Sequence, residues 1–180
     1  MNQNNMHKLR KLKTSFLFAL VGGVIAVALI AAIIIYYRDK PTSAPANRQE
    51  MVHVMGQNVM PFDLNKTSHV FQMTDNGGIQ KVVVKDRSDK EQIELIRQHL
   101  QHEAMNFSAG NYVDPQTLHG NEMSGIKDLQ AGATKVTVQF ESLSDGAQIV
   151  FTTNDQNLIT AIHKWFGAQL SDHGADALSK

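Results

Sequence analysis

The chain has 180 residues, no cysteine and a formal net charge of zero at neutral pH. The lack of cysteine excludes disulfides, thiolate metal sites and cysteine nucleophiles. The two parts of the chain have opposite net charges. Residues 1–40 contain six Lys or Arg and one Asp or Glu, whereas residues 41–180 contain eleven Lys or Arg and sixteen Asp or Glu. The acidic larger part argues against nucleic acid as a partner, since phosphate binding needs a basic surface.

An unbroken apolar run covers residues 16–37 and contains no charged side chain. Roughly 20 apolar residues in a helix span the core of a bilayer, so we expect a transmembrane helix over residues 15–37. A cleaved signal peptide is the alternative, but its apolar core usually has about 7–15 residues. Ala19 and Gly23 have the four-residue spacing that lets two membrane helices pack, which would give a homodimer.

The basic residues before this run predict its orientation. Four Lys or Arg precede the run, at Lys8, Arg10, Lys11 and Lys13. Positive flanks stay in the cytoplasm, so residues 1–14 are expected to be a cytoplasmic tail. The chain is then a single-pass protein of the inner membrane, and its C-terminal part lies in the periplasm.

A polar segment with Pro41 and Pro45 follows, and we expect residues 38–59 to be a linker. Residues 60–177 then form an α+β domain in which one β-β-α unit occurs twice. The first copy has strands at 69–73 and 79–85 and a helix at 89–107. The second has strands at 135–141 and 148–153 and a helix at 155–170. Short helices are expected from residue 114 and over 124–129.

The two copies also match in sequence. Gly78 and Gly146 follow the two hairpin turns at an offset of 68, and Ile96 matches Ile162 at an offset of 66. Chance similarity between two amphipathic units is the alternative. A true repeat predicts a mostly antiparallel sheet of about four strands, with both long helices packed on one face.

Histidine and methionine are the residues that suggest chemistry. Seven of the eight histidines follow the apolar run, and imidazole with thioether but no thiolate suits copper, with zinc as the alternative. Glu103 lies four residues after His99 within an apolar stripe, where a carboxylate needs a partner, although it is solvated if the stripe ends early. The alternative for His173 is a structural role, in which it stabilises the C-terminal end of a helix. The candidate metal ligands are His99, Glu103, His119, Met123, His163 and His173.

Several segments resemble a small family of exported bacterial domains, some of whose members are labelled aspartate carbamoyltransferase. The similarity covers roughly residues 60–177, with MPFDLxxTxHxF from residue 60, LHGxxM from residue 118 and HxWFxAQLSDHG from residue 163. The Ser-Thr-Arg-Thr signature that binds carbamoyl phosphate is absent, and Ser124 stands where the family often has proline. The resemblance implies an exported domain and includes the five histidines His69, His99, His119, His163 and His173.

Two functions are therefore expected as alternatives. The first is a periplasmic domain that binds copper or zinc through His and Met ligands. The second is a scaffold module of the bacterial envelope that binds a protein partner and no metal. The chain contains no G-x-S-x-G, P-loop, GxGxxG or HExxH motif, so we expect no enzyme activity.

Overall fold

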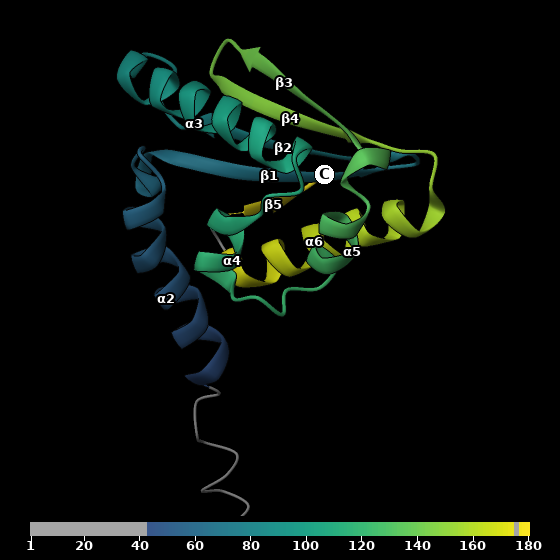
Figure 1. Ribbon diagram of the computed structural model, residues 1–180. Coiled ribbons are helices and arrows are strands. Elements are labelled where there is room, and N and C mark those ends of the chain that lie inside the picture. The colour runs from purple at the N-terminus through teal and green to yellow at the C-terminus, as the bar shows by residue number, and fades with distance from the viewer. Residues whose placement is uncertain (1–42, 175–176) are drawn as a thin grey trace, which may run out of the picture. The chain divides into compact units, whose positions relative to one another are not determined.

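Five strands form one sheet in the order β3-β4-β2-β1-β5 (Figure 1). The computed structural model describes residues 43–174 and 177–180, in which Ala44–Lys180 make one compact unit. Four strands pair antiparallel, and β5 (Ala177–Ser179) runs parallel to β1. The four are β1 (Thr67–Thr74), β2 (Gly77–Val84), β3 (Thr137–Leu143) and β4 (Gly146–Thr152). The predicted α+β class is confirmed, with a mixed sheet.

The helices follow the expected order. The long helices are α3 (Lys90–Ser108) and α6 (Gln156–His173), so β1-β2-α3 and β3-β4-α6 are two copies of one unit. The connection between the copies contains α4 (Val113–His119) and α5 (Ile126–Ala131). Two turns of 3-10 helix, Leu64–Lys66 and Ala133–Lys135, precede β1 and β3. Both short helices predicted for the connection are present.

Each long helix packs mainly on the hairpin of the other copy. Helix α3 follows β2 but lies chiefly on β3 and β4, and α6 follows β4 but lies on β2, β1 and β5 (Figure 1). The two helices share one face of the sheet, because Gly78 of β2 lies against Phe166 of α6 and Val82 lines the same cavity as Leu100 of α3. Neither copy buries its apolar face alone, so the copies interlock.

Aromatic side chains fill the space between the helices and this face. Trp165 is fully buried and meets Phe107, Tyr112 and Phe151 edge-on, with ring centroids 5.3–5.5 Å apart. Edge-to-face pairs at this distance are attractive beyond the area they bury. These contacts join α3, β4 and α6 into one core.

The register of the repeat differs by one position from the sequence-based match. Gly77 and Gly146, at an offset of 69, are the equivalent first residues of β2 and β4, each with its Cα against the neighbouring strand. An offset of 68 places Gly78 and Gly146 on opposite faces, because successive strand residues alternate. Two adjacent glycines in the first turn made the sequence match ambiguous. The offset of 66 in the helices agrees with the structure, since Ile96 and Ile162 are both fully buried.

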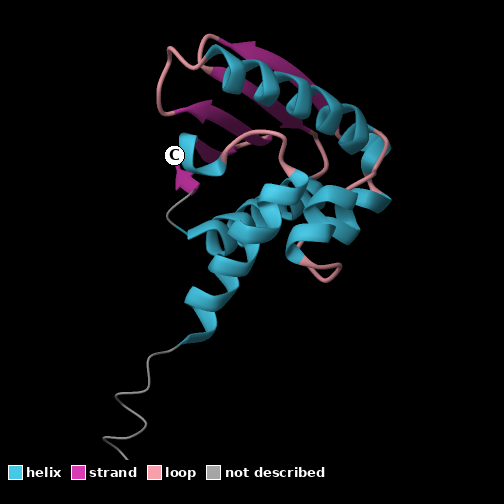
Figure 2. Ribbon diagram, turned by 90° about the vertical axis from the view of Figure 1, so that its left-hand side faces the viewer, coloured by secondary structure: helices cyan, strands magenta, loops and turns pink. Residues whose placement is uncertain are grey.

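A helix occupies most of the segment predicted to be a linker. Helix α2 (Ser43–Val59) extends away from the sheet in two views (Figures 1 and 2). Its contacts explain it, since Val52 is buried and Gly56 lies against the side chain of Leu64. The compact unit therefore begins near residue 44 and not at residue 60. Its helicity depends on tertiary contacts, which composition does not reveal.

The predicted membrane helix at 15–37 and cytoplasmic tail at 1–14 lie outside the described residues. Within residues 43–174 and 177–180, no helix has the length and apolar character needed to cross a bilayer.

Candidate functional site

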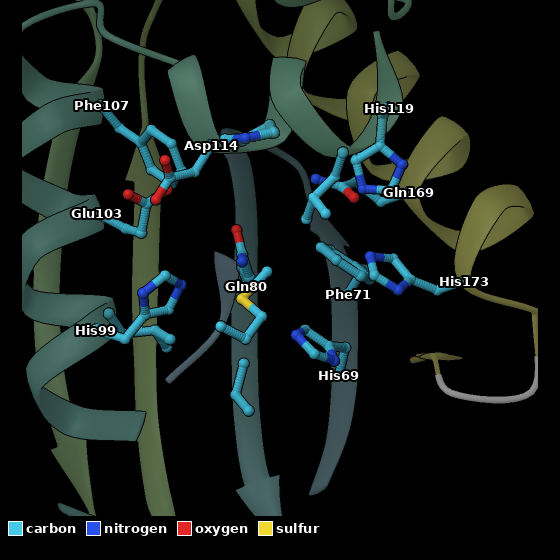
Figure 3. A pocket seen from close by; sticks show the side chains of 15 residues that line it. His69, Phe71, Gln80, His99, Glu103, Phe107, Asp114, His119, Gln169 and His173 are labelled. Carbon is cyan, nitrogen blue, oxygen red and sulfur yellow. The ribbon is translucent and has the colours of Figure 1, made fainter. Parts of the chain in front are cut away.

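A small cavity with both polar and apolar lining lies between α3 and α6, over β1 and β2 (Figure 3). Its volume is about 20 Å³, which is room for one water molecule or one ion. Four histidines line it together with two carboxylic acids, two glutamines and a thioether. These residues are His69, His99, His119, His173, Glu103, Asp114, Gln80, Gln169 and Met60. Polar groups that converge in a buried cavity are a candidate site.

Three of the imidazoles form one wall. The rings of His69 and His173 are nearly parallel, 13° apart, with centroids separated by 5.0 Å. The ring of His119 meets that of His173 edge-on, also at 5.0 Å. His69 faces the cavity because it alternates with Val70 along β1, whereas His119 and His173 end α4 and α6. Residues from three separate elements thus meet at one wall.

Two of these imidazoles, His69 and His119, are neutral at physiological pH. Burial lowers the pKa of His69 well below its ordinary value, and the neighbouring His173, His99 and His119 lower it further. Burial also lowers the pKa of His119, although Asp172 opposes the shift. A neutral imidazole has one nitrogen with a free lone pair, which can accept a proton or bind a metal.

Asp172 determines which nitrogen of His119 carries its proton. His119 Nδ1 lies 2.9 Å from Asp172 Oδ2. Burial raises the pKa of Asp172, but hydrogen bonds from Arg48 and His119 lower it more, so this carboxylate is ionised and only accepts. Nδ1 therefore donates, and Nε2 has the lone pair. A carboxylate behind a histidine is the usual support of a metal-binding imidazole.

The opposite wall, on α3 and α4, is acidic. Burial and the adjacent Asp114 raise the pKa of Glu103 to about 7, and the two carboxyl groups share a hydrogen bond. Asn106 Nδ2 also donates to Glu103 Oε1 at 3.2 Å. His99 lies nearby (Figure 3), and burial lowers its pKa to about 4. Glu103 can therefore take up or release a proton close to neutral pH.

Two amide oxygens in the cavity are unsatisfied. Gln80 Oε1 and Gln169 Oε1 are buried and accept no hydrogen bond from the part of the chain that the structure describes. Gln169 is only 4% exposed. Buried acceptors without partners are costly, so their presence indicates a ligand or water that donates to them.

The structure brings four of the six predicted ligands together and separates two. His99, Glu103, His119 and His173 line the cavity. His163 does not, because its Nε2 donates to the carbonyl oxygens of Thr74 and Gly77 at 3.0 and 2.9 Å.

Met123 also lies apart from the cavity. It is buried beside an open outer cleft of about 460 Å³, which it lines together with His119, Arg48 and Asp172. His119 thus lies between this cleft and the inner cavity.

The ligand set predicted from the sequence omitted four polar residues that line the cavity, namely His69, Asp114, Gln80 and Gln169. His69 had a detectable signal, since it lies two residues before Phe71 and therefore on the same face of a predicted strand. Asp114 and the two glutamines had none, because only the packing of α4 and α6 brings them to the cavity.

No three histidine or carboxylate side chains in the described ranges already form a group that could hold a metal ion. No family model, no curated protein and no solved structure matches the chain. The resemblance to exported bacterial domains therefore stays a prediction.

Proposed function

We propose that this chain is a membrane-anchored periplasmic domain that binds one transition-metal ion in the histidine cavity. The observation that carries the proposal is the wall of His69, His119 and His173. Two imidazoles on one tetrahedral ion, with metal–nitrogen bonds of about 2.0–2.1 Å, have ring centroids about 5 Å apart. Both neighbouring ring pairs of this wall have that spacing, at 5.0 Å.

Copper suits this cavity better than zinc. His69 and His119 are neutral, and Met60 adds a thioether to the same lining. Imidazole and thioether together favour copper, and His119 already has the carboxylate support of a ligand. Compared with the ligand set predicted from the sequence, the proposed set has His69 and Met60 in place of His163 and Met123. Glu103 and His99 lie on the opposite wall of the cavity.

Binding includes a rotation of side chains. The described histidine and carboxylate groups do not yet meet at one point, and the rings of His69 and His173 lie nearly parallel at present. If one of these two rings turns about its Cβ–Cγ bond, it leaves the stacked arrangement and can point a nitrogen at the ion. Such χ2 torsions are broad in histidine and cost little.

The test uses the full chain, purified in detergent without a histidine tag. Its metal content is measured by elemental analysis, and Cu²⁺ and Zn²⁺ are titrated separately by calorimetry. We expect one ion per chain, bound at least tenfold more weakly in His173→Ala and in His69→Gln. His102→Ala is the matched control, because His102 is exposed on α3. A wild-type chain that binds neither ion above a buffer blank overturns the proposal.

The membrane location rests on the apolar run at 16–37 and its basic N-terminal flank. We propose that residues 1–14 are cytoplasmic and that the α+β domain is periplasmic. Alkaline phosphatase fused after Lys180 should be active and green fluorescent protein at the same position dark. The opposite pattern would place the domain in the cytoplasm.

A second candidate function is an interaction module of the envelope without a metal. Met51, Val54 and Met55 are 39–51% exposed on α2, at the spacing of one helix face. Photocrosslinkers at these positions should then capture one envelope protein or a second copy of the chain, and metal titration should show no binding.

A further inference from the structure

One carboxylate, Asp172, is shared between helix α2 and the cavity. Arg48 of α2 donates from Nε to Asp172 Oδ1 and from Nη2 to Oδ2, both at 2.6 Å. The same oxygen Oδ2 accepts from His119 Nδ1 at 2.9 Å. Arg48 Nη2 also donates to the backbone carbonyl of His119 at 2.9 Å. A single arginine therefore contacts both members of the His–Asp pair.

These contacts are protected from water unequally. The side chain of His119 is 1% exposed, that of Asp172 is 11% exposed and that of Arg48 is 47% exposed. The arginine thus covers the solvent side of a buried pair. Two-point pairing of a guanidinium with a carboxylate sets the carboxylate plane as well as its charge. Arg48 therefore fixes the orientation of the acceptor that orients His119.

Two polar side chains of α2 bond to the end of α6. Gln49 Nε2 donates to the carbonyl of Ser171 at 3.2 Å and lies against Gly174. With Arg48 on Asp172, α2 contacts residues on both sides of His173 in sequence. The position of α2 and the position of the cavity wall are thus determined by the same stretch of chain.

We propose that Arg48 is a positioning residue for the cavity and that docking of α2 and ligand binding at His119 strengthen one another. Loss of Arg48 leaves Asp172 free to rotate, so His119 samples both tautomers and presents Nε2 for only part of the time. By linkage, if docking of α2 strengthens ligand binding at His119, then ligand binding strengthens the docking of α2 by the same factor. The ion-dependent half of this inference rests on the proposed function, whereas the positioning of His119 does not.

The first experiment needs no metal. Nitrogen-15 NMR of the histidine rings in the full chain should show His119 as the Nδ1–H tautomer. Arg48→Ala and Arg48→Lys should both shift His119 toward a mixture of tautomers, because neither side chain has the planar fork that pairs with both carboxylate oxygens at once. Lys66→Ala is the matched control, since it removes an exposed ion pair with Asp89 and should leave His119 unchanged. An unchanged tautomer in Arg48→Ala overturns the positioning role.

The second experiment measures the coupling with Cu²⁺ or Zn²⁺ alone as the probe. Arg48→Ala should weaken ion binding about 10-fold to 100-fold, as loss of an outer-shell partner does. The ion should slow hydrogen exchange of the α2 amides in the wild type and not in the variant. Equal affinities with an unchanged exchange rate would overturn the coupling. Absence of any binding by the wild type would overturn the proposed function and the coupling, while the NMR result still decides the positioning role.

Discussion

Arg97 and His163 hold equivalent places in the two repeats, at an offset of 66, and each donates to the backbone at the turn of the opposite hairpin. Arg97 donates to the carbonyls of Leu143 and Gly146. His163 donates to those of Thr74 and Gly77. Arginine and histidine thus perform one task at two symmetric positions, which explains why His163 is absent from the cavity.

This relationship predicts that both side chains stabilise the domain. Arg97→Ala and His163→Ala should each lower the free energy of unfolding by about 1–3 kcal/mol, because each removes two part-buried hydrogen bonds to backbone carbonyls. The two effects should add to within about 0.5 kcal/mol, since the residues act on different hairpins and share no partner. Denaturant unfolding measures both, with the exposed neighbour Lys164→Ala as the control. If both variants lose less than about 0.5 kcal/mol, as ordinary surface substitutions do, these bonds are dispensable.

The glycines at the two turns should be equally sensitive. A Cβ at Gly77 would collide with the carbonyl oxygen of Phe151, and one at Gly146 would collide with that of Val82. The strand must shift to admit either, so Gly77→Ala and Gly146→Ala should each cost more than about 2 kcal/mol. Gly167→Ala is the contrast, because it has open space in a helix and should stabilise by about 0.5–1 kcal/mol. Melting temperatures distinguish these outcomes, and a tolerated alanine at residue 77 would refute the register.

The two walls of the cavity predict opposite dependences of stability on pH. The pKa of Glu103 is raised from 4.5 to about 7 on folding, so its contribution to stability is lost as the pH rises from about 4.5 to 7. The pKa of His99 is lowered from 6.5 to about 4, so its contribution is lost as the pH falls from about 6.5 to 4. Glu103→Gln should therefore flatten the decline toward pH 7, and His99→Gln should flatten the decline toward pH 4.

Urea unfolding at half-unit steps from pH 4 to pH 8 measures these slopes. Glu94→Gln on the exposed face of α3 is the control and should follow the wild type. Parallel curves for Glu103→Gln and the wild type would mean that folding does not shift the pKa of Glu103.

The elements of the domain were predictable because each has a local cause. Alternation of Val136, Val138 and Phe140 predicts β3, and the apolar stripe through Ile93, Ile96 and Leu100 predicts α3. The exchange of helices between hairpins was not predictable, since the same stripe serves either hairpin. Helix α2 was missed for a related reason, because its buried Val52 and its Arg48–Asp172 pair depend on contacts between segments that are distant in sequence.

The cavity was predictable in part. His99 and Glu103 face the core by helical spacing, and that position indicated a partner for the carboxylate. The partner is Asp114, a second acid, which no spacing rule suggests. His69 belongs to the wall because β1 pairs with β2 in the observed register, and a slip of one residue would point it to the other face.

Gln169 should trade stability against binding. Its Oε1 is buried without a partner among the described residues, and such an acceptor costs roughly 1–3 kcal/mol. Gln169→Met has nearly the same shape and removes that cost, so it should raise the free energy of unfolding by about 1 kcal/mol. The variant also removes an amide oxygen from the lining of the cavity, so binding of Cu²⁺ should weaken severalfold. Chemical denaturation and calorimetry on one preparation give both values, and Gln101→Met on the exposed side of α3 should change neither. A variant that is less stable than the wild type would show instead that Gln169 is satisfied in solution and serves the core.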